Sequence, residues 1–258
     1  MDTHRTVSRQ QWLDARLDLL AAEKDLTRQG DRVAQLRRQL PWVEVDKPYV
    51  FEGPAGRVTL GELFDSHRQL LVQHFMLAPG WKEGCKNCSY MADHVDGMRV
   101  HLAQRDTGFV GVSRAPFGDI ERFRRRMGWG FAWVSSHGSS FNHDFGVSFT
   151  PEQVARGRLP YNYGEWPLSG EEWPGVSVFY RDEAGRVFHT YSTYGRGVEV
   201  MMGTYRMLDL TPLGRGEDEE ASSNMKWVRH HDRYDTASTT QAACPEHGCA
   251  EPGRGMRR

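Results

Sequence analysis

Two cysteines in the first half of the chain have the spacing of a redox-active dithiol. Cys85 and Cys88 are separated by two residues. A disulfide requires its two Cα atoms to lie within roughly 4.4–6.8 Å of each other. Two cysteines three positions apart meet this limit on the first turn of a helix. The Cys-x-x-Cys spacing therefore predicts a site for thiol–disulfide exchange.

The segments on either side of the pair indicate how it is positioned. The apolar run 70–77 predicts a buried strand, and the segment 89–104 predicts a helix. At the start of that helix, Cys85 would lie near unpaired N–H groups and the positive end of the helix dipole, both of which favour a thiolate. Cys85 is therefore the predicted nucleophile and Cys88 the resolving thiol. The disulfide itself is the redox group, so no cofactor and no metal are expected.

Two other interpretations of the cysteine pair stay open. The pair has the spacing of half a zinc site, but no second Cys-x-x-Cys or histidine pair lies at the usual distance along the chain. Two structural cysteines at the start of a helix would give the same pattern. The strand–loop–Cys-x-x-Cys–helix order favours the redox interpretation.

The length and the composition of the chain limit the class of protein to which it can belong. The 258 residues fit one large domain, or one domain with additions. The 33 Lys and Arg residues nearly balance 34 Asp and Glu residues, so no overall field that attracts nucleic acid or a membrane is expected. Four cysteines are too few for a disulfide scaffold, which favours a reducing compartment. With neither an apolar run near the roughly 18 residues of a membrane span nor a visible signal peptide, a cytoplasmic location is predicted.

The chain divides into three parts: residues 1–41, 42–235 and 236–258. Residues 1–41 have a capping box and helical apolar spacing, interrupted by Gly30, which predicts a helical hairpin or a long bent helix. This extension is either the arm of a homodimer or a helix packed on its own domain. The last part is expected to be a disordered tail. For its two cysteines, Cys244 and Cys249, three alternatives stay open: a redox shuttle, a metal-binding segment, or two cysteines without a function.

The middle part predicts a three-layer α/β fold of the thioredoxin-like class. Strands alternate with helices after the dithiol, which indicates parallel strands joined by right-handed crossovers. A hairpin over 173–191 and a last helix over 197–210 follow. Between them, residues 135–172 are rich in Gly, Ser, Asn, Pro and aromatics. This stretch predicts a long insertion, either a binding site or a loop ordered by its own aromatic side chains.

Several strings of the sequence match one family. They include Trp81-Lys-Glu-Gly-Cys85, Ala92-Asp-His-Val-Asp-Gly97, Arg126-Met-Gly-Trp129, His189-Thr-Tyr-Ser-Thr-Tyr194 and Leu208-Asp-Leu-Thr-Pro212. Together they resemble the bacterial thioredoxin-like family catalogued as domain of unknown function eight-nine-nine. The resemblance runs from the N-terminal helix to about Tyr234. It implies a thioredoxin fold with a dithiol–disulfide oxidoreductase role, and it supplies no substrate.

Three further residues are predicted to support the dithiol. Trp81 lies in the loop that leads to Cys85. Pro174 stands just before a strand, where thioredoxin folds place a cis-proline against the dithiol. Ordinary thioredoxins carry a buried aspartate on the strand before the dithiol, and this neighbourhood holds His74 or Gln73 instead. His74 is expected either to assist proton transfer at Cys88 or to be a hydrogen-bonded core histidine.

The sequence thus predicts a thiol–disulfide oxidoreductase whose thiol or disulfide substrate is unknown. One alternative is a peroxiredoxin-like thiol peroxidase, although the Pro-x-x-x-Thr-x-x-Cys signature is absent from positions 78–85. Another is a non-catalytic thioredoxin-fold protein that binds a partner or a metal through the 135–172 insertion.

Overall fold

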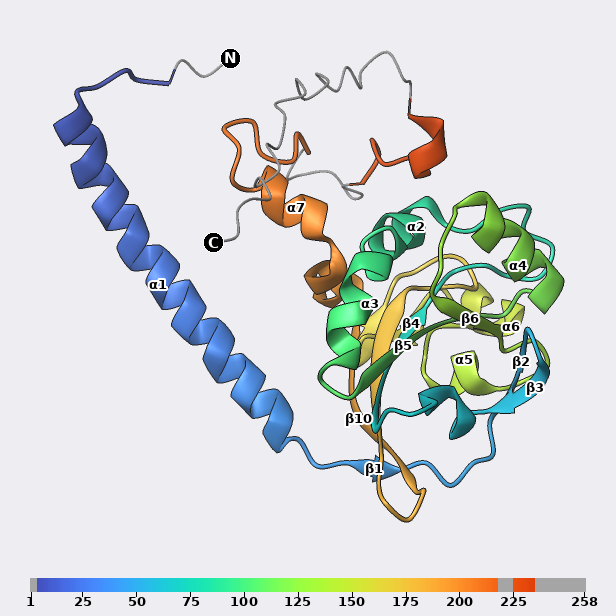
Figure 1. Ribbon diagram of the computed structural model, residues 1–258. Coiled ribbons are helices and arrows are strands. Elements are labelled where there is room, and N and C mark those ends of the chain that lie inside the picture. The colour runs from blue at the N-terminus through green and yellow to red at the C-terminus, as the bar shows by residue number, and fades with distance from the viewer. Residues whose placement is uncertain (1–3, 218–224, 235–258) are drawn as a thin grey trace, which may run out of the picture.

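The computed structural model describes residues 4–217 and 225–234. Its centre is an eight-stranded mixed sheet with strand order β1-β10-β9-β4-β5-β6-β2-β3 (Figure 1). The strands are β1 Val43–Glu44, β2 Val50–Gly53, β3 Gly56–Thr59, β4 Gln69–His74, β5 Thr107–Ser113, β6 Ala132–Ser135, β9 Gly175–Arg181 and β10 Val187–Tyr194. The helices are α1 Arg9–Gln39, α2 Lys86–Ala92, α3 Val95–Ala103, α4 Phe117–Arg126, α5 Phe141–Asp144, α6 Pro151–Ala155 and α7 Gly203–Leu208. Three short 3₁₀ helices are η1 Glu62–Phe64, η2 Gly195–Met201 and η3 His231–Arg233.

The strand that leads to the dithiol, β4, lies inside the sheet. It pairs with β5 in parallel, from Gln69 opposite Thr107 to His74 opposite Val112. On its other side it pairs with β9 in the antiparallel sense, with His74 opposite Gly175. The C-terminal end of β4 and the N-terminal end of β9 therefore meet at one edge, which brings the dithiol loop next to Pro174.

Helices cover both faces of the sheet and form the three predicted layers. One face packs against α2, α3, α4 and the η2–α7 segment, through two clusters of buried side chains that include Phe75, Trp133 and Val176. The opposite face packs against η1 and α5, through a cluster that includes Phe64 and Phe141. Alternate residues of a strand point to opposite faces. The fold is α/β, as the sequence predicts.

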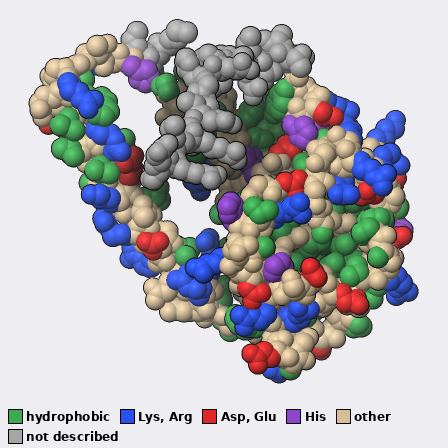
Figure 2. All heavy atoms as spheres, in the orientation of Figure 1, with side chains coloured by type: hydrophobic (Ala, Val, Ile, Leu, Met, Phe, Trp, Pro, Cys, Tyr) green, Lys and Arg blue, Asp and Glu red, His purple; other side chains and the backbone are tan. Residues whose placement is uncertain are grey.

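The N-terminal extension is one continuous helix rather than a hairpin. The capping box between Ser8 and Gln11 begins α1, Gly30 does not interrupt it, and it ends before Pro41. Its 31 residues span about 46 Å at 1.5 Å per residue. None of its side chains is fully buried, and near its C-terminal end the Arg37 guanidinium lies 5.3 Å from the centroid of the Tyr191 ring in β10. Figure 2 shows hydrophobic and basic side chains interspersed along it, and the homodimer arm stays a prediction.

The 135–172 insertion is ordered. It contains α5, α6 and a hairpin of β7 Leu159–Tyr161 and β8 Gly164–Trp166. Buried side chains hold it together, among them Phe149, Leu159 and Tyr161. Aromatic side chains of the insertion, together with Tyr194 of β10, pack to order this segment.

Other boundaries differ from the expected ones. The segment 89–104 forms two helices, α2 and α3, and the segment 197–210 forms η2 followed by α7. Residues 225–228 are irregular. Cys244, Cys249 and the tail 236–258 lie outside the described residues. Within the part of the chain described, no helix combines the length and hydropathy that crossing a membrane requires.

Candidate functional site

Close packing fixes the loop that presents Cys85. The backbone N–H of Cys85 donates a hydrogen bond to the carbonyl of Met76 at 3.0 Å. A Cβ atom on Gly84 would lie 2.5 Å from the ring of Phe75 and 2.7 Å from the ring of Phe123. Only glycine fits between these two buried rings. Gly84 therefore brings the chain against the core one residue before Cys85.

Cys85 caps the N-terminus of α2, as its position in the sequence predicts. The largest cause of its lowered pKa is a hydrogen bond from the Cys88 thiol, followed in effect by the backbone N–H groups of Cys88 and Asn87 and by the charge of Lys86. Burial opposes this shift, yet the pKa of Cys85 falls to about 6. A thiol with this pKa is largely ionised at neutral pH, and the thiolate is the nucleophilic form.

Cys88 differs from Cys85 in its burial and in the direction of its pKa shift. It lies one turn into α2 and is 1% exposed. The hydrogen bond to Cys85 raises the pKa of Cys88 well above its ordinary value, and burial raises it further. Both thiols are unbridged, so this is the reduced form of the pair. The arrangement gives one ionised thiol and one protonated thiol within a single helical turn.

Both sulfur-bearing residues line a cavity of about 510 Å³. Its walls are largely apolar and include four methionines, which come from the loop after β4, from α2, from the η2–α7 segment and from the segment after residue 224. The methionines are Met76, Met91, Met202 and Met225. Trp173, Pro174 and Tyr161 form the wall contributed by the insertion and the start of β9. A substrate that enters this cavity meets both cysteines and an adaptable apolar surface.

Comparison with known proteins identifies the family to which this chain belongs. Residues 1–234 match the model of the family described as "Bacterial protein of unknown function (DUF899)". The chain belongs to this family. No protein with a curated description matches the sequence.

Solved structures similar to this family member include two peroxiredoxins. Xanthomonas campestris Peroxiredoxin Q matches with a TM-score of 0.44 and 10% identity, over 65% of this chain and 97% of that chain. Peroxidoxin BcpB from Mycobacterium tuberculosis matches with a TM-score of 0.43 and 14% identity, also over 65% and 97%. A Chlorobium tepidum protein, provisionally described as thiol:disulfide interchange protein DsbE, matches with a TM-score of 0.39 and 13% identity, over 64% and 97%.

Pro174 lies where the sequence predicts, but its peptide bond is trans. It lines the dithiol cavity directly before β9. No peptide bond between described residues is cis, so the cis geometry expected from thioredoxins is not present. The Tyr161 hydroxyl donates to the Pro174 carbonyl at 2.6 Å and accepts from the backbone N–H of Gly195 at 2.8 Å. Tyr161 thus joins this wall to η2, a role that the sequence did not indicate.

His74 does not lie beside the dithiol, which corrects the prediction of a supporting role. Its Nε2 is 2.7 Å from the hydroxyl of Ser177, and its ring packs against Phe141 and Phe145 on the opposite face of the sheet. Burial is the main cause that lowers its pKa to about 3, so the ring is neutral at physiological pH. The alternative of a core histidine describes His74.

Gln73 occupies the position facing the dithiol. It is fully buried, and its Nε2 donates to the carbonyl oxygen of Cys88 at 3.1 Å. Its Oε1 is buried without a hydrogen-bond partner among the described residues. The period of two along a strand explains both this contact and the placement of His74 on the other face.

Trp81 is 40% exposed in the loop before Cys85. It lines a separate surface cavity of about 610 Å³, together with Pro79, Arg114 and Glu171. The structure therefore brings Pro174, Cys85 and Cys88 together and leaves Trp81 at a neighbouring surface. Within the described ranges, no group of three or more His, Cys, Asp or Glu side chains is placed to share a metal ion.

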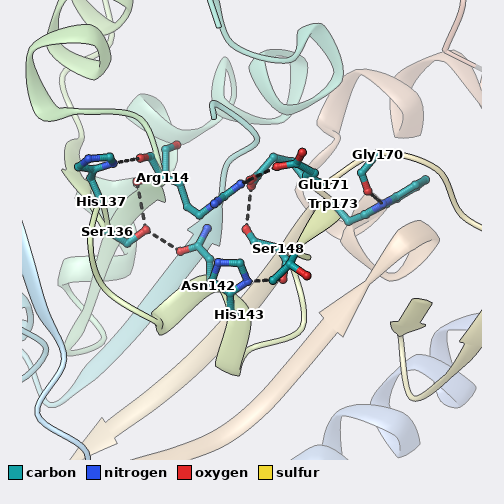
Figure 3. Close-up of polar contacts among 12 residues, drawn as sticks. Arg114, Ser136, His137, Asn142, His143, Ser148, Gly170, Glu171 and Trp173 are labelled. Atoms are coloured by element: carbon teal, nitrogen blue, oxygen red, sulfur yellow. Dashed lines mark hydrogen bonds and ion pairs between the residues drawn. The ribbon is translucent and has the colours of Figure 1, made fainter. Parts of the chain in front are cut away.

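A buried ion pair supports the wall that contains Pro174. Arg114 follows β5, and its Nε donates to the Glu172 carboxylate at 2.5 Å. Figure 3 shows the Arg114 side chain extending toward Glu171 and Ser148. The hydroxyl of Ser148 donates to the other oxygen of Glu172 at 2.8 Å. Burial is the main cause that raises the pKa of Glu172. These contacts fix the backbone immediately before Trp173 and Pro174.

Proposed function

We propose that this protein is a thiol–disulfide oxidoreductase in which Cys85 attacks and Cys88 resolves. One observation carries the proposal: Cys85 is the N-cap residue of α2, Cys88 lies one turn into the same helix, and both line one cavity. An ionised thiol beside a protonated thiol has the chemistry that a two-step exchange requires.

In the reductive direction, the Cys85 thiolate attacks one sulfur of a substrate disulfide. The substrate S–S bond breaks, a Cys85–substrate mixed disulfide forms, and the departing substrate thiolate takes up a proton. Cys88 then loses its proton and attacks the Cys85 sulfur, which releases the second substrate thiol. Two electrons pass from the protein to the substrate, and a Cys85–Cys88 disulfide remains. The reverse sequence oxidises a substrate dithiol.

The other residues of the site position the two cysteines and shape the cavity, and they take no part in the transfer of electrons. Gln73 holds the Cys88 carbonyl, which fixes the first turn of α2 under the cavity. Gly84 sets the close approach of the loop to the core. The four methionines give the cavity an apolar wall that adapts to different substrate surfaces. The substrate is therefore proposed to present its sulfur within an apolar surface.

A trapped mixed disulfide tests the proposal. Cys88→Ser in a Cys244→Ser, Cys249→Ser background leaves Cys85 as the only thiol. With glutathione disulfide, this variant is expected to hold one glutathione on Cys85, detected by intact-mass and peptide-mass measurement. The matched control, Cys85→Ser in the same background, leaves the buried Cys88 and is expected to react far more slowly. Equal labelling of the two variants by glutathione would contradict the roles assigned to Cys85 and Cys88.

A further inference from the structure

The long helix α1 carries one apolar stripe along almost its whole length. When the positions of a seven-residue repeat are lettered a to g from Trp12, the a and d positions follow one another at steps of three and four residues. They are Trp12, Ala15, Leu19, Ala22, Leu26, Gln29, Val33 and Leu36. All of them except Gln29 are apolar. This is the repeat of a coiled coil, in which the a and d side chains face a partner helix.

The described residues leave this stripe open. Leu26, near its middle, is 71% exposed, and no side chain of α1 is fully buried. Figure 1 shows α1 extending away from the sheet, and its contact with β10 through Arg37 lies near its C-terminal end. An apolar surface of this extent marks an interaction site. Most of the stability of a helix in a protein comes from the packing of such a face.

We propose that the stripe binds the α1 helix of a second copy of this chain in an antiparallel coiled coil. Each a position then lies opposite a d position of the second copy. Leu26 faces Ala22 of the second copy, and Val33 faces Ala15, so both alanines meet a large side chain. A parallel pair would place Ala22 against Ala22 and Ala15 against Ala15, which leaves gaps between the helices at those two levels.

The same register pairs the two helices along their whole length. With Leu26 opposite Ala22, Arg9 lies opposite Gln39 of the second copy. These are the first and last residues of α1, so all 31 residues overlap. The seam is about 46 Å long at 1.5 Å per residue. A two-fold axis passes beside residue 24, and both copies contribute the same surface, as in a closed dimer.

Charges beside the stripe favour the antiparallel sense. Antiparallel helices bring g positions next to g positions, and Asp18 then lies beside Arg32 of the second copy on both sides of the axis. In a parallel pair, g positions lie beside e positions. Asp18 would then face the acidic Glu23, and Arg32 would face the basic Arg37. Asp25 and Glu23 each meet their own copy near the antiparallel axis, but each is already paired with an arginine of its own helix.

The mass of the full chain in solution, measured by light scattering, tests the surface. The wild type is expected at twice the chain mass of 29.5 kDa. Leu19→Asp places a charge in the seam and is expected to give the monomer mass. Leu17→Asp is the matched control, because Leu17 and Leu19 are 53% and 54% exposed but Leu17 lies outside the a and d positions. It is expected to stay dimeric. A monomeric wild type, or equal loss of the dimer in both variants, would overturn the proposal.

Engineered cysteines test the orientation, in a chain whose four native cysteines are replaced by serine. This result is therefore independent of the proposed thiol chemistry. When Ala15→Cys and Val33→Cys chains are co-expressed and treated with the thiol oxidant diamide, we expect a disulfide between residues 15 and 33 of two chains. The control is each variant expressed alone, because a disulfide between two Ala15→Cys chains requires parallel helices. Crosslinking of each variant with itself, without the mixed product, would overturn the antiparallel assignment.

Discussion

At the residue scale, the site depends on the difference between two thiols of the same type. The N-terminus of α2 and the Cys88 hydrogen bond favour a negative charge on Cys85, whereas Cys88 is enclosed by the core. Neither property requires a metal or an additional base near the pair. The same difference decides which cysteine a disulfide substrate meets first.

The pH dependence of alkylation measures this difference. In a Cys244→Ser, Cys249→Ser background, the rate of Cys85 alkylation by iodoacetamide should rise with a midpoint at about pH 6, because only the thiolate reacts and its pKa is lowered. Cys88→Ala removes the hydrogen bond with the largest effect and should move the midpoint up toward the ordinary value of about 8.5. A midpoint near 8.5 in both proteins would show that α2 does not activate Cys85.

The residues of the site differ in how far the sequence alone predicts them. Cys85, Cys88 and the helix start were predicted because their spacing is local. The sequence left two roles open for His74, since side chains alternate between the faces of a strand and the sequence does not say which face covers the dithiol. Gln73 is its immediate neighbour, and it takes the contact with Cys88. The methionine wall was missed because its members are far apart in the sequence and meet only after folding.

At the element scale, the insertion between β6 and β9 is part of the site rather than a separate loop. Its end places Trp173 and Pro174 opposite the dithiol, and the buried pair of Arg114 and Glu172 fixes that end. The sequence predicts an aromatic-rich insertion, but this ion pair joins residues 58 positions apart and has no local signature. The order of β4, β5 and β9 around Cys85 follows from the predicted α/β pattern.

Loss of the Arg114 guanidinium tests the structural role of this ion pair. Arg114→Met leaves the Glu172 carboxylate buried without its partner, which typically costs about 3–5 kcal/mol in the free energy of unfolding. This loss in the free energy of unfolding should be smaller at pH 5 than at pH 8, because protonation of Glu172 removes the buried charge. Urea unfolding at both pH values measures it. Arg122→Met, which removes an exposed pair with Asp119, should cost less than about 1 kcal/mol. Equal losses for the two variants would contradict this role.

At the scale of the whole molecule, the chain combines an α/β body, built on the eight-stranded sheet, with two additions. The long helix α1 buries none of its side chains, and the segment 225–234 returns to the dithiol entrance. The sequence predicted the body and the N-terminal addition, but it counted the segment 225–234 as part of the body. It did not show that the C-terminal addition begins beside Cys85, because that depends on ion pairs such as Arg126 with Asp232.

The most direct test of the central claim is the reduction potential of the Cys85–Cys88 pair. It is measured by titration with glutathione buffers in a Cys244→Ser, Cys249→Ser variant, with the disulfide quantified by mass. The account predicts a reversible two-electron transition between about −300 and −120 mV, the range of working oxidoreductases. Rapid peroxide consumption by the same variant would instead identify a thiol peroxidase. A pair that forms no disulfide under any oxidant, or that binds zinc in its place, would contradict the account.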